Sequence, residues 1–399
     1  MTTPAVLDAT RPDSTRALRE SATVIREVQL WRLAAQTPGL PESLPAPLAG
    51  PAVVPVGEPD PEHLHRFAVC LVADGGLGWH GPIPQAVALI VGDQLASGLI
   101  GHDAAQPRRL PYRPTSGRHG GGPHARTARS AVELACWDLA SQASGRSVSD
   151  LLGGTVRTSI PAYASALGLD PEHPAAAEVA AWISQSGFWG QKWPVTKALI
   201  TAGPRSTAKA LGRLREAAGG RFMVDGLGRC RVDEAMRLLP VLADLDIAFA
   251  EELLPPGSWD WHRLRAHGPG VPVAAGEHAV DPGEQTRLLT GGSVDVWQID
   301  PGWGGGLARS LHTVELAADL GIPVFPHGAH LPAATALAAA CCRDKIPAVE
   351  YHLTVEPLRQ QIYSTPVQPE QGHLAVRTGP GLAGELLTVG DKPVMQVSS

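Results

Sequence analysis

The stretch FMVD, residues 222–225, opens a series of short apolar runs that carry an acidic residue or a histidine at or near their end. The later runs are IAFAEE (247–252), VPVAAGE (271–277), VDVWQID (294–300), IPVFPH (322–327) and AVEYHL (348–353). Amphipathic stretches with helical spacing separate them, such as VDEAMRLLPVLADL (232–245) and LARSLHTVELAADLG (307–321). This alternation is typical of parallel βαβ units, and so many units predict a (β/α) barrel.

The polar residues of these runs recur once per predicted unit, at intervals of 23 to 27 residues. They are Asp225, Glu251, Glu277, Asp300, His327 and Glu350. In a barrel the C-terminal ends of the strands meet at one mouth, where catalytic groups lie. Burying so many acids on apolar strands elsewhere would be very costly. We therefore predict that these side chains form one active site.

Three of the acids, Asp225, Glu251 and Glu277, come from successive predicted strands. Converging carboxylates repel one another unless a cation lies between them, and oxygen-only ligands select a hard ion. Mg²⁺ is the commonest such ion that keeps open positions for a substrate. The alternative is that each acid pairs with an arginine or caps a helix, which is less expected for three acids at matched spacing.

Asp300 and His327 fall on adjacent predicted strands. A carboxylate that binds one ring nitrogen fixes the tautomer and raises the basicity of the other nitrogen, so the pair predicts a general base. Taken alone, His327 would more often be a structural histidine. The glycine-rich GWGGGLARS (302–310) fits no phosphate-binding motif, so we expect a close-approach turn at the barrel rim rather than a phosphate cradle.

The N-terminal part predicts a different architecture. SATVIREVQLWRL (21–33) and HRFAVCLVAD (65–74) read as strands, and the glycines of DGGLGWHG (74–81) turn the chain back into a small antiparallel sheet. ARTARSAVELACWDLASQASG (125–145) has helical spacing and ends at a glycine. The glycine-rich loop before it carries Arg118 and His119, and it is either a solvated linker or a lid over a ligand.

The composition argues against several classes of function. A net charge of -6 disfavours a nucleic-acid partner and means that an anionic substrate needs a local positive charge. The five cysteines include no CxxC pair, so neither a disulfide framework nor a zinc ribbon is expected. There is no signal-peptide pattern and no apolar stretch of about 18 residues, so we expect a cytoplasmic protein without a membrane partner.

Several motifs together resemble the mandelate racemase branch of the enolase superfamily. They are SAVELACWDLASQASGRSVSDLLGG (130–154), FMVD, FAEELLPP (249–256), AAGEH (274–278), QIDPGWGGG (298–306) and FPHG (325–328). The resemblance implies an α/β fold, a (β/α)7β TIM-like barrel with an α+β capping domain formed by the N-terminal part and the C-terminal tail. The implied divisions are the capping domain (21–154), the barrel (155–368) and a segment returning to the capping domain (369–399). Residues 1–20, which have low hydrophobicity and two prolines, are predicted to be a flexible tail.

Closer similarity is to the L-rhamnonate dehydratase group of acid-sugar dehydratases, through GFWGQKWPV (187–195), EELLPP, GEH, DPGWGGGL and PHGAH. The resemblance implies that three acids bind Mg²⁺ and that a histidine acts as base, oriented by an aspartate. These residues are Asp225, Glu251 and Glu277 for the metal, His327 for the base and Asp300 for its orientation. Three further residues have implied catalytic roles: Lys192 near the substrate carboxylate, Glu350 as its hydrogen-bonding electrophile, and His278.

The sequence also departs from the family pattern. Pro194 replaces the second lysine of the KxK motif, and Lys197 lies further along as a conceivable substitute. Leu227 stands where an asparagine is usual, and EEL replaces EEP. A racemase that uses two bases needs one on each face of the α-carbon, so the missing lysine favours dehydration, which needs a single base. The loop with Arg118 and His119 belongs to the capping domain, which in this family sets specificity.

These inferences predict an acid-sugar dehydratase, a carbon-oxygen lyase of carbohydrate catabolism that yields a 2-keto-3-deoxy acid. The first alternative is a racemase, epimerase or cycloisomerase that acts on another carboxylate through the same enediolate. The second is a non-catalytic metal-binding relative. The predicted partner is a small-molecule carboxylate, and the resemblance implies a homo-oligomer.

Overall fold

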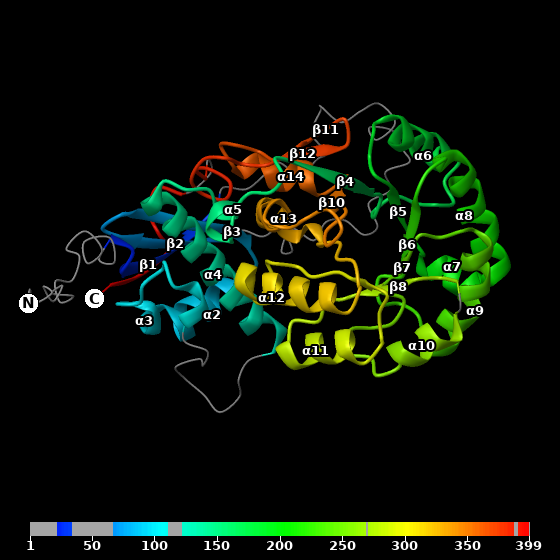
Figure 1. Cartoon of the computed structure of the whole chain (residues 1–399), viewed down its shortest axis with the longest axis horizontal. Coiled ribbons are helices and arrows are strands. Elements are labelled where there is room, and N and C mark those ends of the chain that lie inside the picture. Colours follow the sequence, from blue (N-terminus) through cyan, green and yellow to red (C-terminus); the bar gives the residue numbers. More distant parts are fainter. Residues whose placement is uncertain (1–21, 34–66, 111–121, 269, 387–389, 399) are drawn as a thin grey trace, which may run out of the picture.

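A computed structural model describes residues 22–33, 67–110, 122–268, 270–386 and 390–398. These residues form a capping unit around a four-stranded sheet and a barrel-like unit of parallel strands with helices outside them (Figure 1). The predicted tail 1–20 and the loop residues Arg118 and His119 lie outside the described residues.

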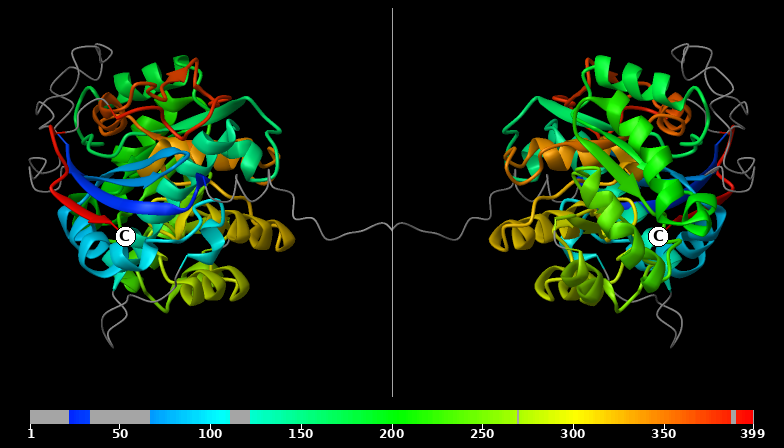
Figure 2. Two further views of the ribbon diagram at one scale, coloured as in Figure 1. Left: turned by 90° about the vertical axis from the view of Figure 1, so that its left-hand side faces the viewer. Right: turned by 90° about the vertical axis from the view of Figure 1, so that its right-hand side faces the viewer.

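The capping sheet is antiparallel, in the order β13-β1-β2-β3. Its strands are β1 (Ile25–Arg32), β2 (Phe67–Ala73), β3 (Gly76–Ile83) and β13 (Met395–Ser398). The small N-terminal sheet is therefore confirmed, and the end of the chain completes it at β1. Figure 2 shows these strands at one end of the molecule, where the C-terminus also lies.

The helices of the capping unit pack against this sheet and against the barrel-like unit. They are α2 (Gln85–Ile90), α3 (Ala96–Leu99) and α4 (Pro123–Ser144). The long helix α4 begins with a proline in its first turn and ends at Gly145 in the left-handed region (φ 65°), a conformation that glycine adopts without strain. Helix α4 contacts both β3 and α12 (Gly306–Asp319), so this helix joins the two units.

Seven parallel strands form the inner layer of the barrel-like unit. They are β4 (Ser159–Ser165), β5 (Gln191–Pro194), β6 (Phe222–Asp225), β7 (Ala250–Glu251), β8 (Val273–Ala275), β9 (Val296–Trp297) and β10 (Val349–His352). Each strand from β4 to β8 pairs with the next, and β10 pairs back with β4. The order follows the sequence, as expected for βαβ units.

The run IPVFPH, predicted as a strand, forms only an isolated bridge between Val324 and Trp297. Two prolines interrupt this run, and proline cannot donate to a strand ladder. The segment nevertheless bridges its neighbours through the backbone, because the His327 N–H donates to Ile299 (3.0 Å) and Pro326 accepts from the Glu350 N–H (3.2 Å).

Helices cover the outside of these strands (Figure 1). They are α5 (Val148–Leu151), α6 (Ala176–Gln185), α7 (Lys197–Ala202), α8 (Pro204–Ala218), α9 (Val232–Asp244), α10 (Trp261–His267), α11 (Pro282–Thr290), α12, α13 (Leu331–Ala339) and α14 (Glu356–Arg359). Among the described residues, no helix combines the length and apolarity that crossing a bilayer requires.

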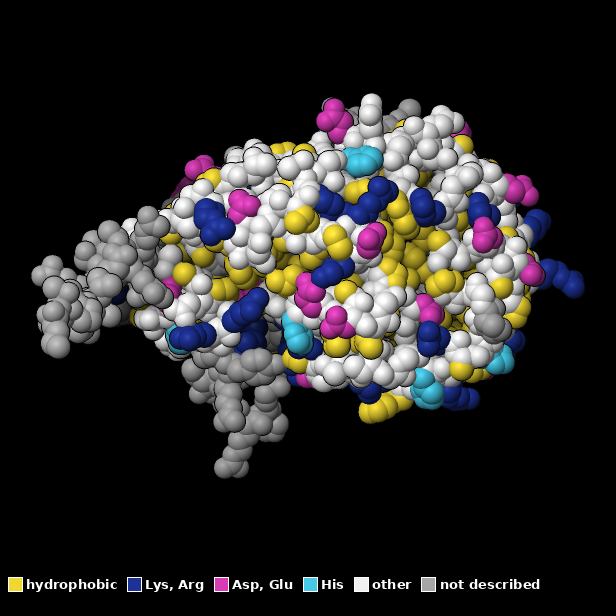
Figure 3. Space-filling model, in the orientation of Figure 1, with side chains coloured by type: hydrophobic (Ala, Val, Ile, Leu, Met, Phe, Trp, Pro, Cys, Tyr) yellow, Lys and Arg dark blue, Asp and Glu magenta, His cyan; other side chains and the backbone are white. Residues whose placement is uncertain are grey.

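The segment after the last barrel strand divides between the two units. β12 (His373–Ala375) pairs with β4 and with the two-residue strand β11 (Pro369–Glu370), whereas β13 joins β1. The surface carries both signs of charge, and Lys and Arg side chains gather where the capping unit adjoins α12 (Figure 3).

Candidate active site

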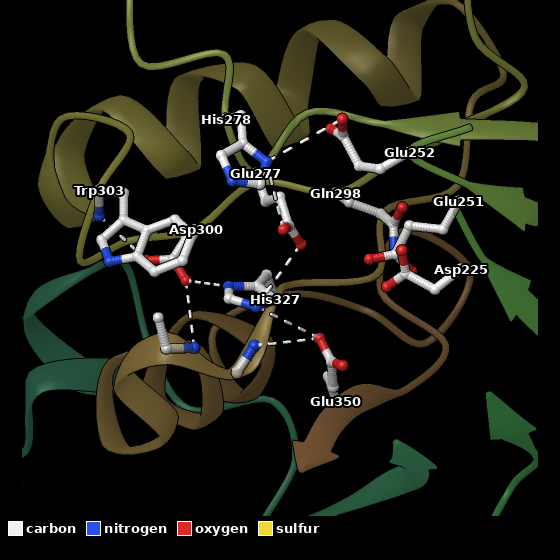
Figure 4. Close-up of polar contacts among 12 residues, drawn as sticks. Asp225, Glu251, Glu252, Glu277, His278, Gln298, Asp300, Trp303, His327 and Glu350 are labelled. Atoms are coloured by element: carbon white, nitrogen blue, oxygen red, sulfur yellow. Dashed lines mark hydrogen bonds and ion pairs between the residues drawn. The ribbon is translucent and has the colours of Figure 1, made fainter. Parts of the chain in front are cut away.

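The C-terminal ends of the parallel strands bring the predicted polar residues to one region, where Glu277, His327 and Glu350 line a cavity of about 400 Å³. Asp225 and Glu251 are the last residues of β6 and β7, Glu350 lies in β10, and Glu277 and Asp300 follow β8 and β9 within three residues. Figure 4 shows these side chains arranged around His327. Sequence spacing alone therefore predicted the convergence of these strand ends.

Lys192 lies behind this cavity as the counter-ion of three carboxylates. Its Nζ is 2.7 Å from Glu251 Oε1, 2.9 Å from Glu350 Oε1 and 3.1 Å from Asp225 Oδ2, and its side chain is fully buried. Burial alone would lower the pKa of Lys192, but the neighbouring carboxylates raise it well above its ordinary value. The lysine expected at the substrate carboxylate therefore remains charged among acids and does not line the cavity.

The three acids predicted to bind a metal are divided between two partners. Asp225 and Glu251 contact the Lys192 ammonium, whereas Glu277 Oε2 lies 3.5 Å from His327 Nε2. Within the described part of the chain, the donor atoms that lie within 4.8 Å of one another belong to Glu277, His327 and Glu350. The predicted triad thus does not form one compact cluster here, because an ammonium group already neutralises two of its members.

The mouth nevertheless suits a hard divalent cation. Burial raises the pKa of Glu251 and of Glu252 well above the ordinary range, and nearby carboxylates raise it further, although Lys192 lowers that of Glu251. Three carboxylates here share one ammonium group. Glu252 Oε2 and Gln298 Oε1 are buried and have no hydrogen-bond partner among the described residues. All these ligand atoms are oxygens. Magnesium and calcium prefer oxygen ligands, whereas transition metals more often bind nitrogen or sulfur.

The predicted Asp300–His327 pair is present. His327 Nδ1 lies 2.6 Å from Asp300 Oδ2, and Asp300 Oδ1 accepts hydrogen bonds from the backbone N–H groups of Gly302 (2.6 Å) and Trp303 (3.0 Å). These donors hold the carboxylate in place, so Nδ1 carries the proton toward it and Nε2 faces the cavity. This is the arrangement expected of a general base.

The acids around His327 also set its basicity. Burial lowers the pKa of His327, but Glu277, Glu350 and Asp300 raise it by a larger amount, so that its net value is about 9. His278, the other predicted histidine of the site, is half-exposed at the cavity, and its Nδ1 lies 3.3 Å from Glu277 Oε1. Glu277 therefore lies between two imidazole rings (Figure 4).

The sequence reasoning missed several residues of the site. The Trp303 ring lies 4.8 Å from the His327 ring and 5.7 Å from the His278 ring. Gln298 donates through Nε2 to Glu251 Oε2. Arg229, His352 and Arg359 also line the cavity. Trp303 could have been found, because it stands between Asp300 and the glycines that drew attention to this turn.

Three other features lie near the site. Lys197 is exposed at the start of α7 and does not line the cavity. Burial lowers the pKa of His330 to about 4, and its ring accepts from the Ala333 N–H, so this histidine has a structural role. The glycine-rich turn is the expected close approach, because a Cβ added at Gly306 would meet Glu133 Oε2 at 2.0 Å.

Comparisons with known proteins agree with the division into a capping unit and a barrel-like unit. The mandelate racemase / muconate lactonizing enzyme N-terminal domain matches residues 70–153, and the enolase C-terminal domain-like family matches residues 174–388. A D-galactarolactone cycloisomerase of Agrobacterium fabrum (strain C58 / ATCC 33970) is 30% identical over 336 residues, which cover 78% of this chain and 86% of that protein.

Solved structures share the fold. The 3,6-anhydro-D-galactonate cycloisomerase of Zobellia galactanivorans is 24% identical, with a TM-score of 0.70 over 91% of this chain and 97% of that one. A racemase from Streptomyces coelicolor A3(2), solved with bound magnesium, is 23% identical, with a TM-score of 0.71 over 91% and 97%. Both domain matches and the cycloisomerase relative lead to one assignment: the chain belongs to the mandelate racemase / muconate lactonizing enzyme family of the enolase superfamily.

Proposed function

We propose that this chain is a magnesium-dependent enzyme that removes the proton next to the carboxylate of an acid sugar and then eliminates the oxygen substituent on the β-carbon. The observation that carries this proposal is the His327 ring, whose Nδ1 is bound by Asp300 and whose Nε2 faces a cavity lined by acids. A histidine oriented by a carboxylate is a common general base.

Asp225, Glu251 and Glu277 would hold the ion, with Glu350 beside them. When bound, Mg²⁺ would supply the positive charge that stabilises negative charge developing on the substrate carboxylate. His327 must be neutral to accept the α-proton. Because Glu277 and Glu350 raise the pKa of His327, the neutralisation of these acids would favour the neutral ring.

A single base supports elimination better than racemisation. Lys192 is bound by three carboxylates, and Pro194 stands where a second lysine would lie. After accepting the α-proton through Nε2, His327 can return a proton to the departing β-oxygen on the same face. If that oxygen is a hydroxyl group, water leaves and the product enol becomes a 2-keto-3-deoxy acid, as the similarity to the L-rhamnonate dehydratase group suggests.

A second candidate function, cycloisomerisation, begins with the same removal of the α-proton. The 30% identity to a D-galactarolactone cycloisomerase favours a substrate whose departing β-oxygen belongs to a ring, so that the ring opens and no water is lost. An acid-sugar substrate is also consistent with Arg229, a half-buried cavity residue whose guanidinium forms no hydrogen bond or ion pair with the described residues. Such a group can bind a carboxylate or hydroxyl oxygen of the substrate.

The test is to incubate the purified protein and Mg²⁺ in heavy water with aldonates, aldarates and their lactones. We expect a keto acid that carries deuterium on the former β-carbon, because the α-carbon becomes the ketone and the enol takes its new proton from the solvent. This product should be lost with a chelator and restored by Mg²⁺. Product mass separates the candidates, because dehydration removes one water and cycloisomerisation does not. Deuterium uptake without elimination would indicate a racemase or epimerase, and neither exchange nor product across the panel would reject the proposal.

A further inference from the structure

A carboxylate of the capping unit reaches across to the barrel-like unit and caps helix α12. Glu133, on α4, accepts the Leu307 N–H through Oε2 and the Ala308 N–H through Oε1, each at 2.8 Å. Its Oε1 also accepts from Trp137 Nε1 at 2.7 Å. The first N–H groups of a helix have no partner within the helix, and a negative charge is favourable there.

The turn that precedes α12 is shaped to admit this carboxylate. Gly305 and Gly306 have φ values of 105° and 82°, which favour glycine. The Gly305 N–H donates to Ser130 Oγ at 2.9 Å, so a second residue of α4 holds the same turn. A side chain at position 306 would collide with Glu133. The capping helix and the turn are therefore fitted to each other.

The same turn also holds the base. Asp300 lies at its start and binds His327 Nδ1 through Oδ2, while its Oδ1 accepts from Gly302 and Trp303 in the turn. The Trp303 ring packs against the His327 ring. Residues 300–308 are called here the 300–308 turn. This turn supplies Asp300, which binds His327, at one end, and it binds Glu133 at the other.

We propose that Glu133 is a positioning residue, which fixes the Asp300–His327 pair through the 300–308 turn and so makes the reactivity of the barrel depend on the docked capping helix. This inference rests on the proposed function in so far as His327 is the base. Small displacements of a base matter, because a shift of about 1 Å can cost roughly 100-fold in rate.

Helix α4 offers a matched control. Asp138 is also buried, at 2% exposure against 5% for Glu133, and it also accepts two backbone N–H groups. Its Oδ2 accepts from Trp79 (2.9 Å) and its Oδ1 from Leu382 (2.7 Å), neither of which belongs to the 300–308 turn. Replacing Asp138 should weaken the contacts of α4 with its neighbours, and so lower the stability of the protein, without displacing His327.

The experiment compares Glu133→Gln, Glu133→Ala and Asp138→Asn in the full chain with Mg²⁺. Gln retains one acceptor oxygen, whereas Ala retains none. We expect Glu133→Ala to lower kcat by about 10- to 100-fold with KM changed by less than about threefold, and Glu133→Gln to recover part of this loss. Asp138→Asn should lower the melting temperature comparably but change kcat by less than about twofold.

Two readouts do not depend on turnover. Hydrogen exchange of the amides of residues 305–308 should be faster in both Glu133 variants and unchanged in Asp138→Asn. The proton NMR signal of the His327 Nδ1–H, identified by its loss in His327→Asn, should shift or broaden only in the Glu133 variants. A parent protein that turns over nothing would count against the proposed function, while these readouts would still decide the role of Glu133. Equal effects of the Glu133 and Asp138 variants would overturn it.

Discussion

The buried acids of helix α4 and those at the barrel mouth are similarly withdrawn from water, but different donors satisfy them. On α4, Glu133 and Asp138 accept hydrogen bonds from fixed backbone N–H groups of neighbouring segments. At the mouth, three carboxylates share the single ammonium of Lys192, and Glu252 Oε2 has no hydrogen-bond partner among the described residues.

This difference separates structural acids from acids that can bind a ligand. The backbone N–H groups give the α4 acids hydrogen-bond partners without adding a charge, and they partly offset burial, which still raises the pKa to about 7 for Glu133 and about 6 for Asp138. The mouth retains an excess of negative charge that an external cation can relieve. The number of buried acids therefore says less about function than the donors that each acid has, and three measurements can test this distinction.

The largest expected effect is that of His327→Asn. We expect α-proton exchange and turnover to fall by about 10²- to 10⁴-fold, because asparagine cannot act as a base. The matched control is His262→Asn, which changes an exposed histidine of α10 and should leave activity intact. Residual exchange close to that of the parent would assign the base to another residue of the mouth.

A smaller effect is expected from Lys192→Met, which removes the ammonium group from three buried carboxylates. Breaking a buried ion pair typically costs about 3 to 5 kcal/mol, and we expect a loss of this size in the free energy of unfolding without metal. Mg²⁺ should restore more stability to this variant than to the parent, because the carboxylates then lack another cation.

The control for this prediction is Lys345→Met, since Lys345 pairs with the exposed Glu315 and should contribute at most about 1 kcal/mol. Denaturant unfolding with and without Mg²⁺ measures both variants. If Lys192→Met and Lys345→Met destabilise equally, the charge at the mouth is not organised around Lys192.

The smallest effect concerns pH. The pKa of His327 is raised from 6.5 to about 9 in the metal-free protein, so the folded state holds this proton more tightly than the unfolded state. The resulting stabilisation is fully present below pH 6.5 and is lost as the pH rises to about 9. It amounts to roughly 3 kcal/mol, at 1.36 kcal/mol for each pKa unit.

The measurement is the difference in unfolding free energy between the parent and His327→Asn from pH 6 to pH 9.5, without metal. We expect this difference to shrink steadily with rising pH. A constant difference would mean that the acids of the mouth do not hold a proton on His327.

The sequence by itself determined the elements and the list of acids. Strands β6 to β9 and helix α4 follow from local periodicity and from end signals such as Gly145, which act between residues close along the chain. The recurrence of Asp225, Glu251 and Glu277 once per unit was enough to predict a shared mouth, because parallel strands end on the same side.

Only the tertiary structure decided which charges meet. Lys192 pairs with Glu251, 59 residues away, and Glu133 caps a helix that begins more than 170 residues later. Trp303 contacts His327 because of the path that the turn takes, and the hydrophobic periodicity of the sequence does not predict that path. The physical reason is that the energy and the protonation of a buried acid depend on the hydrogen-bond donors and charges within a few ångströms of it. The fold, rather than the neighbouring sequence, supplies those groups.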